Sequence, residues 1–169
     1  MGYALAVRSL PETSHEHHDR IIPHVDRLPE LAEMLGNVPA TEFAAAFDEQ
    51  YRFVVGQLVP HMAAIEATLY GDLERLMGGR HSMAPMREEH QHLRRLIGVL
   101  GDVRPLVLRG ELGEADRMTL RRVLYRLYSI LKVHLAEEEM YLGVLDHNLS
   151  DEEKDALARG VDHAAAEPV

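Results

Sequence analysis

Hydrophobic residues recur along this chain at spacings of three and four, the pattern of a helix that buries one face. The clearest case lies toward the C-terminus, where the buried positions are Leu120, Leu124, Leu127, Leu131, His134, Glu138, Tyr141 and Leu145. Alternating runs of β-branched residues, which would indicate strands, are absent from the sequence. The pattern therefore predicts an all-α protein, and it places two ionisable residues, His134 and Glu138, at positions that face the core.

Interruptions of this pattern predict four long helices and a short fifth one. The expected ranges are 14–35, 41–77, 85 to about 101–105, 116–148 and 151–165. Glycine and proline mark most of the ends, and Ser150 with Glu153 has the form of a capping box. Pro60 lies inside the second range and predicts a kink there.

Short connections between the long helices predict an antiparallel up-down four-helix bundle with a short fifth C-terminal helix. A chain of 169 residues, 46% of them hydrophobic, is long enough for one core. We expect an irregular N-terminal segment over 1–12, the bundle over 13–149, and the C-terminal helix and tail over 150–169.

Composition excludes several classes of function. The net charge of −10, without a long basic run, argues against nucleic acid as a partner. The chain has no cysteine, which excludes disulfides, thiolate zinc sites and cysteine nucleophiles and fits a cytoplasmic protein. No apolar run approaches the length of a membrane span or forms a signal peptide, so we expect no membrane association.

Histidine is unusually frequent, with 11 residues, and one lies in the apolar pattern of each long helix: His18, His61, His90 and His134. Glu66 and Glu138 follow two of them by five and four positions. A buried charged group without a partner costs several kcal/mol, and a shared cation would satisfy all of these side chains together. Imidazole and carboxylate without thiolate suit iron, manganese or zinc. The number of ligands exceeds what one tetrahedral zinc needs and favours two octahedral ions, for which we choose iron.

Any one of these histidines taken alone is more often a hydrogen-bonded core residue than a ligand. The hypothesis of a metal site depends on all four occurring together, one on each helix. The remaining histidines are expected at the surface or outside the ligand shell: His15, His17, His24, His81, His92, His147 and His163. Among them His15, one turn before His18, is the first candidate for a substitute ligand.

Four segments carry a resemblance to a known family: HEHHDRIIPHVDRL, HMAAIEATLYGDL, MREEHQHL and HLAEEEMYLGVL. In this order, on four successive helices, they resemble the hemerythrin-like (HHE cation-binding) family, whose members are four-helix bundles that hold a non-haem diiron centre. The resemblance implies two iron ions, oxo- or hydroxo-bridged. It further implies His18, His61, His90 and His134 as imidazole ligands, with Glu66 and Glu138 as bridging carboxylates.

Three features of the ligand set stay open on the sequence alone. Glu139 is the alternative to Glu138, because both offsets from a ligand histidine occur in the family. The best-known oxygen carriers of the family have a second histidine on the third helix, whereas this chain has Met86 and Arg94 at the two possible positions. Tyr141 and Tyr70 are candidate substitute ligands, although a hydrogen-bonded core position is favoured for each.

The missing helix-three histidine would leave one iron with fewer imidazoles and a more open coordination position. The resemblance then implies chemistry with O2, hydrogen peroxide or nitric oxide in stress response, with catalase-like peroxide dismutation favoured over O2 storage. The alternative is an iron- or oxygen-responsive sensing module without turnover. A ferritin-like oxidase with Glu-x-x-His motifs ranks third. The expected partner is a small diatomic or peroxide ligand, and the expected state is a monomer or weak homodimer.

Overall fold

The computed structural model describes residues 10–80, 82–147 and 149–166; the side chains of 10–17, 68, 144–146 and 160–166 lie outside this description. Its elements are α1 (Leu10–Met34), α2 (Ala40–Phe53), the π-helical turn η1 (Val54–Leu58), α3 (Val59–Leu76), α4 (Ala84–Arg109), α5 (Glu114–Asp146) and α6 (Asp151–Ala166). The described residues contain helices and connections and no strand, which confirms the predicted all-helical class. None of the described helices is both long enough and apolar enough to cross a membrane.

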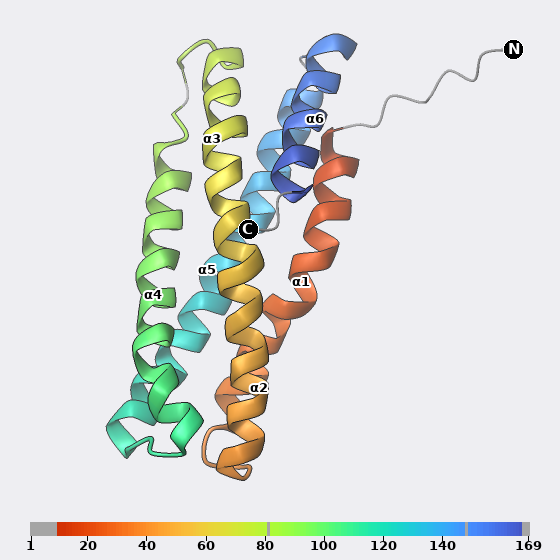
Figure 1. Cartoon of the computed structure of the whole chain (residues 1–169). Coiled ribbons are helices and arrows are strands. Elements are labelled where there is room, and N and C mark those ends of the chain that lie inside the picture. The colour runs from red at the N-terminus through yellow and green to blue at the C-terminus, as the bar shows by residue number, and fades with distance from the viewer. Residues whose placement is uncertain (1–9, 81, 148, 167–169) are drawn as a thin grey trace, which may run out of the picture.

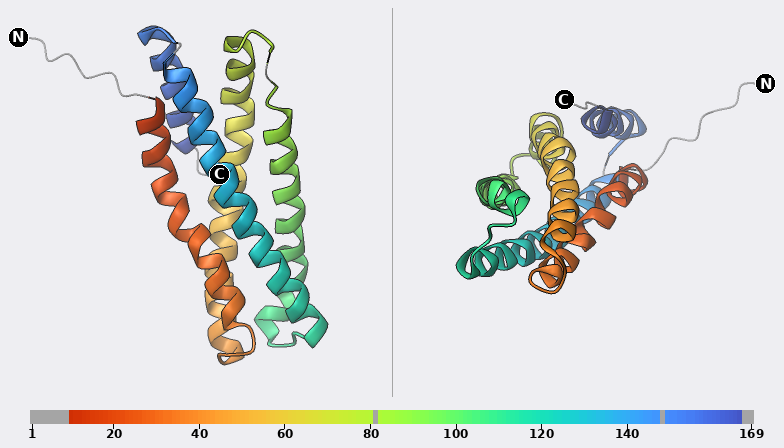
Figure 2. Two further views of the ribbon diagram at one scale, coloured as in Figure 1. Left: turned by 180° about the vertical axis from the view of Figure 1, so that it is seen from behind. Right: turned by 60° about the horizontal axis from the view of Figure 1, so that its bottom comes forward.

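The long helices lie side by side, as the two opposite views in Figures 1 and 2 show. α2, η1 and α3 form one continuous rod. The connections α1–α2 and α4–α5 lie at one end of the molecule, and the α3–α4 connection lies at the other. α1 packs mainly on α5, α4 packs on α2 and α5, and α6 packs on α3 and α1. The four rods thereby enclose a common interior.

The expected kink at Pro60 takes the form of the π-helical turn η1. The backbone N–H of Val59 donates to the carbonyl of Val54, five residues earlier, and Pro60 lies in the first turn of α3, where its missing N–H costs little. The wider turn rotates α3 relative to α2. Within the turn Val54 and Leu58 are buried, whereas Val55 is 42% exposed.

The prediction that the third long helix ends near residues 101–105 was wrong. α4 continues through Pro105 to Arg109 and ends at Gly110, which has a left-handed φ of 69°. Arg104 pairs with Asp48 of α2 at 2.7 Å, and Val107 is buried, so contacts on both sides of Pro105 hold the last turns in place. Tertiary packing here overrides a local helix-breaking signal.

The other ends differ from the prediction by a few residues. α1 begins at Leu10 instead of Ser14, and α5 spans Glu114–Asp146. The capping box before α6 is confirmed, because the Ser150 backbone N–H donates to the Glu153 carboxylate at 2.9 Å and the Glu153 N–H donates to the Ser150 hydroxyl at 3.4 Å.

The buried side chains form two apolar clusters with a polar layer between them. The larger cluster includes Leu28, Leu58, Leu93 and Leu131, and the smaller one joins α3, α4, α5 and α6, with Leu157 of α6 as a member. Among the described side chains, five of the six buried polar ones are His18, His61, His90, His134 and Glu138. On α4 and α5, His90 and Glu138 fall between residues of the two clusters, so one level of the interior is polar.

Candidate metal centre

Four helices each supply one histidine to this polar layer. His18 comes from α1, His61 from α3, His90 from α4 and His134 from α5. Their exposed fractions are 1%, 7%, 1% and 3%, and that of Glu138 on α5 is 3%. The structure therefore buries five of the six residues that the sequence singled out as principal ligands. Full burial of this many ionisable side chains requires that each find a charged or hydrogen-bonding partner.

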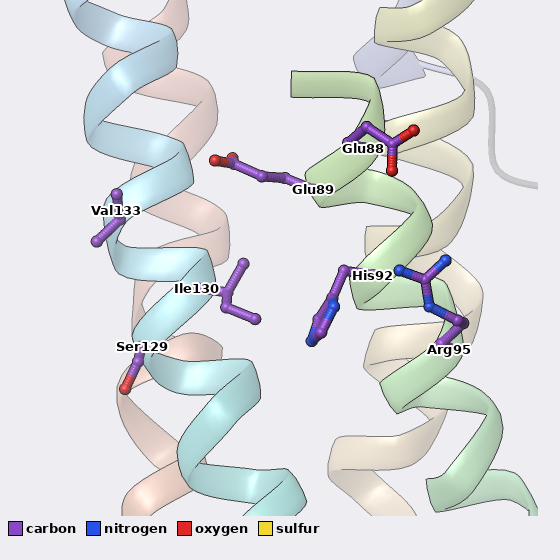
Figure 3. A pocket seen from close by; sticks show the side chains of 7 residues that line it. All are labelled: Glu88, Glu89, His92, Arg95, Ser129, Ile130 and Val133. Carbon is purple, nitrogen blue, oxygen red and sulfur yellow. The ribbon is translucent and has the colours of Figure 1, made fainter. Parts of the chain in front are cut away.

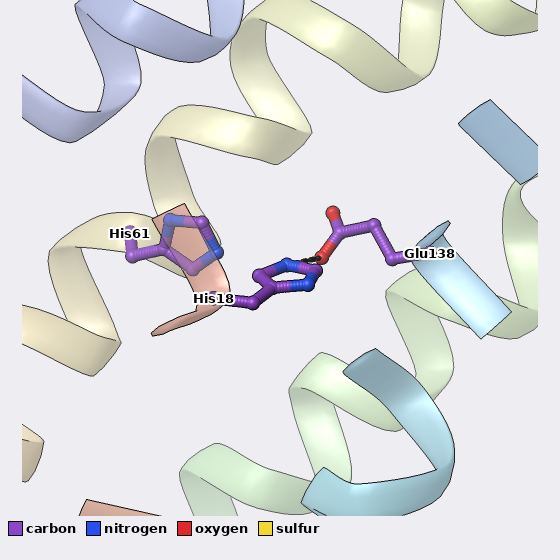
Figure 4. Close-up of side chains that lie close together, drawn as sticks. All are labelled: His18, His61 and Glu138. Carbon is purple, nitrogen blue, oxygen red and sulfur yellow. Dashed lines mark hydrogen bonds and ion pairs between the residues drawn. The ribbon is translucent and has the colours of Figure 1, made fainter. Parts of the chain in front are cut away.

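The first group within the layer consists of His18, His61 and Glu138. One ligand atom from each lies within 4.8 Å of the others, and Figure 4 shows the three side chains pointing toward one another from three helices. His18 Nε2 donates to Glu138 Oε2 at 3.2 Å, while His18 Nδ1 donates to Glu139 at 3.0 Å. Burial lowers the pKa of His18, but these two carboxylates outweigh it and leave the pKa raised. The two carboxylates thus hold the His18 ring between them, with Nε2 directed at Glu138.

The second group consists of His90 and His134, whose Nε2 atoms face each other at 2.8 Å. His90 Nδ1 donates to Glu66 at 2.7 Å, and His134 Nδ1 donates to Glu89 at 2.8 Å. A neutral imidazole with its proton on Nδ1 offers only a lone pair at Nε2. Two such lone pairs repel at this distance unless a proton or a metal ion lies between them.

Glu138, a member of the first group, also lies close enough to His134 of the second group to feel its charge. Burial by itself raises the pKa of its carboxyl group, but the hydrogen bond from His18 and the charges of His61, His18 and His134 outweigh it and lower the pKa to about 2. The buried Oε1 atom of Glu138 has no hydrogen-bond partner among the described residues. An ionised oxygen without a partner in an apolar interior is costly, and a cation at this point would satisfy it.

An outer set of glutamates fixes the orientation of three of the imidazoles. Glu139, Glu66 and Glu89 accept from Nδ1 of His18, His90 and His134, respectively. Their side chains are 35%, 26% and 32% exposed, so they lie at the margin of the layer. Histidine ligands of metals commonly donate their other ring N–H to a carboxylate in this way, which directs the remaining nitrogen to the metal.

The comparisons with known proteins agree with this geometry. A family model described as the hemerythrin HHE cation binding domain matches residues 10–145. This chain belongs to that family. No match was found among the curated proteins or among the solved structures. As a hemerythrin HHE protein, the chain is a metal-binding helical domain, and its histidine and glutamate cluster lies inside the matched region.

Glu66 was expected to bridge two metal ions of the hemerythrin centre. In the structure its Oε1 atom accepts from His90 Nδ1 and, at 2.9 Å, from Arg94. Arg94 holds one of the two positions where the oxygen carriers of the family have a second helix-three histidine; in this chain it binds the carboxylate beside His90. In this arrangement Glu66 orients His90 from the outside, and its role as a ligand stays a prediction.

The other proposed ligands of the hemerythrin site lie at different distances from it. The Tyr70 hydroxyl is 3.4 Å from His90 Nε2 in a fully buried position. Burial and the charge of Glu138 raise the pKa of Tyr70 well above its usual value, so the side chain stays a phenol. Tyr141 is half-buried and packs against the smaller apolar cluster. The side chain of His15 lies outside the described residues.

Glu89 is a residue of the centre that the sequence did not identify. The sequence indicated it only as the glutamate of a Glu-x-x-His motif with His92. Its carboxylate extends from α4 toward α5 (Figure 3). There it accepts a hydrogen bond from His134 Nδ1. This contact joins residues 45 positions apart, and helical spacing within α4 contains no signal for it.

Replacing Glu89 by glutamine is expected to weaken iron binding by about 10- to 100-fold, because the amide loses the charge that orients and polarises His134. Iron affinity would be measured by competition with a chelator. Asp102→Asn, an exposed change on the same helix, is the matched control and should leave the affinity unchanged. Equal affinities of the Glu89→Gln variant and the wild type would show that His134 needs no such partner.

Proposed function

We propose that this chain is a non-haem diiron protein that reacts with O2, hydrogen peroxide or nitric oxide, with catalase-like dismutation of hydrogen peroxide as the favoured activity. The proposal includes the antiparallel up-down four-helix bundle of the family as the scaffold that positions the irons. Its support is the family membership together with the polar layer of buried imidazoles and carboxylate.

The observation that carries the proposal is a pair of unfavourable contacts in the polar layer. Two imidazole Nε2 atoms face each other at 2.8 Å, and one oxygen of Glu138 is buried without a described partner. Two cations, one near each histidine group and both beside Glu138, would resolve both conflicts. A single cation beside His18 and His61 would leave the His90–His134 conflict in place.

In this assignment His18, His61, His90 and His134 supply imidazole nitrogens and Glu138 supplies the carboxylate between them. Two iron ions held by these residues would supply the redox chemistry with a small ligand. The protein contributes orientation through Glu139, Glu66 and Glu89, and the two apolar clusters on either side restrict the access of water. The Tyr70 phenol lies beside His90, where it can donate a proton in a hydrogen bond.

Peroxide chemistry is favoured over O2 storage because α4 contributes one imidazole to the layer. One turn before His90 is Met86, a buried apolar side chain, and one turn after it is Arg94, which pairs with Glu66. An iron held near α4 would therefore have fewer imidazole ligands than in the oxygen carriers of the family, which would favour reaction with a bound small ligand over its simple release.

Iron-loaded protein is expected to release O2 from hydrogen peroxide, measured with an oxygen electrode. The metal-free protein, and protein loaded with zinc, are the controls, because zinc has no redox chemistry. If the diferrous protein instead binds O2 reversibly for hours and hydrogen peroxide yields no gas, the catalase-like assignment is wrong.

One contact favours sensing as a second candidate function. Leu157 of α6 is 3% exposed and packs in the cluster that contains Tyr70 and Ile65, next to the polar layer. Rearrangement around Tyr70 on iron loading would change the packing of α6. Iron-dependent protease sensitivity within residues 149–166, combined with no peroxide turnover, would favour this function.

A further inference from the structure

Exposed apolar side chains concentrate on one face of α5. Among the described residues, six large hydrophobic side chains are exposed, and four of them are Met118, Tyr125, Val133 and Met140, at 47%, 37%, 55% and 58%. At about 100° per residue these four lie within roughly 80° of one another around the helix. We call this set the α5 stripe. Scattered exposed hydrophobics are normal, whereas an aligned set on one helix is typical of a contact surface.

The α5 stripe is symmetric about its own centre. Met118 and Met140 lie eleven residues on either side of Ser129, and Tyr125 and Val133 lie four residues on either side of it. Consider a twofold dimer in which antiparallel α5 helices cross at Ser129. Met118 of one copy then meets Met140 of the other, and Tyr125 of one copy lies near Val133 of the other. A surface that repeats itself under a twofold rotation fits a second copy of the same chain.

The charged residues along α5 also favour an antiparallel arrangement of two α5 helices. From residue 117 to residue 136 all the charged residues are arginine or lysine. Three glutamates, Glu137, Glu138 and Glu139, follow directly. Glu138 is buried and Glu139 is bound to His18, so Glu137 is the acidic residue considered for a contact here. Antiparallel pairing brings Arg122 of one copy to within one residue of the level of Glu137 of the other. Parallel pairing would place the basic halves against each other and is disfavoured.

A pocket beside the stripe provides a place for one of these basic side chains. It has a volume of about 480 Å³ and lies between α4 and α5 (Figure 3). Its α4 wall carries Glu88 and Glu89 together with His92 and Arg95, and its α5 wall carries Ser129, Ile130 and Val133. An arginine suits such a pocket, since its stem packs on apolar side chains while its guanidinium pairs with carboxylates. Arg126 lies on the α4 side of the stripe, three residues before Ser129.

We propose that two copies of this chain associate through antiparallel α5 helices about a twofold axis at Ser129, with Arg126 of each copy entering the α4–α5 pocket of the other. The contact runs from Met118 to Met140, about 33 Å of helix at 1.5 Å per residue. It covers the outer side of Glu89, the partner of His134, so dimer formation limits solvent access to that side of the metal centre.

Sedimentation velocity of the full chain over a wide range of concentrations tests the interface. The wild type is expected to show a monomer–dimer equilibrium. Met140→Glu and Arg126→Glu should each weaken the dimer at least tenfold. Met140→Glu introduces a charge into the apolar contact, and Arg126→Glu reverses the charge that enters the pocket of the other copy. The matched control is Leu108→Glu, an exposed apolar position on α4 outside the stripe, at 46% exposure, which should leave the equilibrium unchanged.

Charge reversal distinguishes this arrangement from nonspecific association. Arg122→Glu should weaken the dimer, and Glu137→Arg added to it should restore the dimer, since the two positions lie within one residue of the same level across the axis. Circular dichroism verifies that each variant is folded. The proposal is overturned if the wild type is monomeric at all concentrations, or if Leu108→Glu weakens the dimer as much as the other variants do. It is also overturned if the double variant dimerises no more tightly than Arg122→Glu. The measurement needs no iron, so its failure leaves the proposed function untouched.

Discussion

Replacing Glu138 by glutamine is expected to weaken iron binding by at least about 100-fold, beyond the usual effect of changing an outer partner of a ligand. The glutamine keeps the size of the side chain and its hydrogen bonding to His18. It removes the negative charge that interacts with both histidine groups and the buried oxygen that no described residue satisfies. The affinity for Fe²⁺ would be measured anaerobically by competition with a chelator.

The matched control for Glu138→Gln is Glu114→Gln, which removes an exposed carboxylate from the first turn of the same helix. It should bind iron as the wild type does. Circular dichroism of both metal-free variants should match that of the wild type, because the change at 138 keeps the volume of the side chain. Unchanged iron affinity in folded Glu138→Gln would remove Glu138 from the centre.

Iron loading is expected to stabilise the fold by about 4 kcal/mol per ion at a free iron concentration 1000-fold above the dissociation constant. The ion binds the assembled layer and not the unfolded chain, in which the four histidines are far apart. For Glu138→Gln at the same iron concentration, a 100-fold weaker affinity reduces the gain to about 1.4 kcal/mol. Urea unfolding followed by circular dichroism, with and without Fe²⁺, measures both values.

The same titration has a second use, because chelation should return the wild type to the stability of the metal-free protein. Zinc provides a control without redox chemistry that still binds imidazole and carboxylate. An identical urea midpoint with and without metal, in protein shown to be folded, would mean that the buried histidines are held by one another and by the outer glutamates alone.

The helical periodicity predicted the fold class and most of the polar layer because both depend on which face of a helix is buried. His18, His61, His90, His134 and Glu138 all lie in phase with apolar residues, and all five are buried. A polar residue at a position that the helical pattern reserves for apolar ones is a strong local signal, because such residues usually avoid the interior. This signal can be recognised in each helix separately, without knowledge of how the helices pack.

The differences arise where a contact between helices decides the outcome. Pro105 is a helix breaker by local rules, but Arg104 pairs with Asp48 on another helix and the last turns of α4 persist. Glu66 lies about 140° around the helix from His61 on spacing alone, and in the structure it faces His90 and Arg94. Neither Arg94 nor Glu89 could be placed without the packing of α4 against α3 and α5.

The π-helical turn η1 is a further feature that the sequence did not predict. Pro60 indicated a disturbance in the second helix, but a kink and a widened turn have the same sequence signal. The widened turn shifts every later residue around the axis, so the positions of His61 and Met62 cannot be extrapolated from the buried residues of α2. Regular periodicity cannot be carried across such a turn.

Anomalous scattering at the iron absorption edge, from crystals of iron-loaded protein, tests the diiron centre directly. Two iron peaks are expected inside the polar layer, one beside His18 and His61 and the other beside His90 and His134, with the Glu138 carboxylate between them. A protein that is folded and saturated with iron, but whose layer contains no peak and keeps His90 and His134 in direct contact, would contradict this expectation.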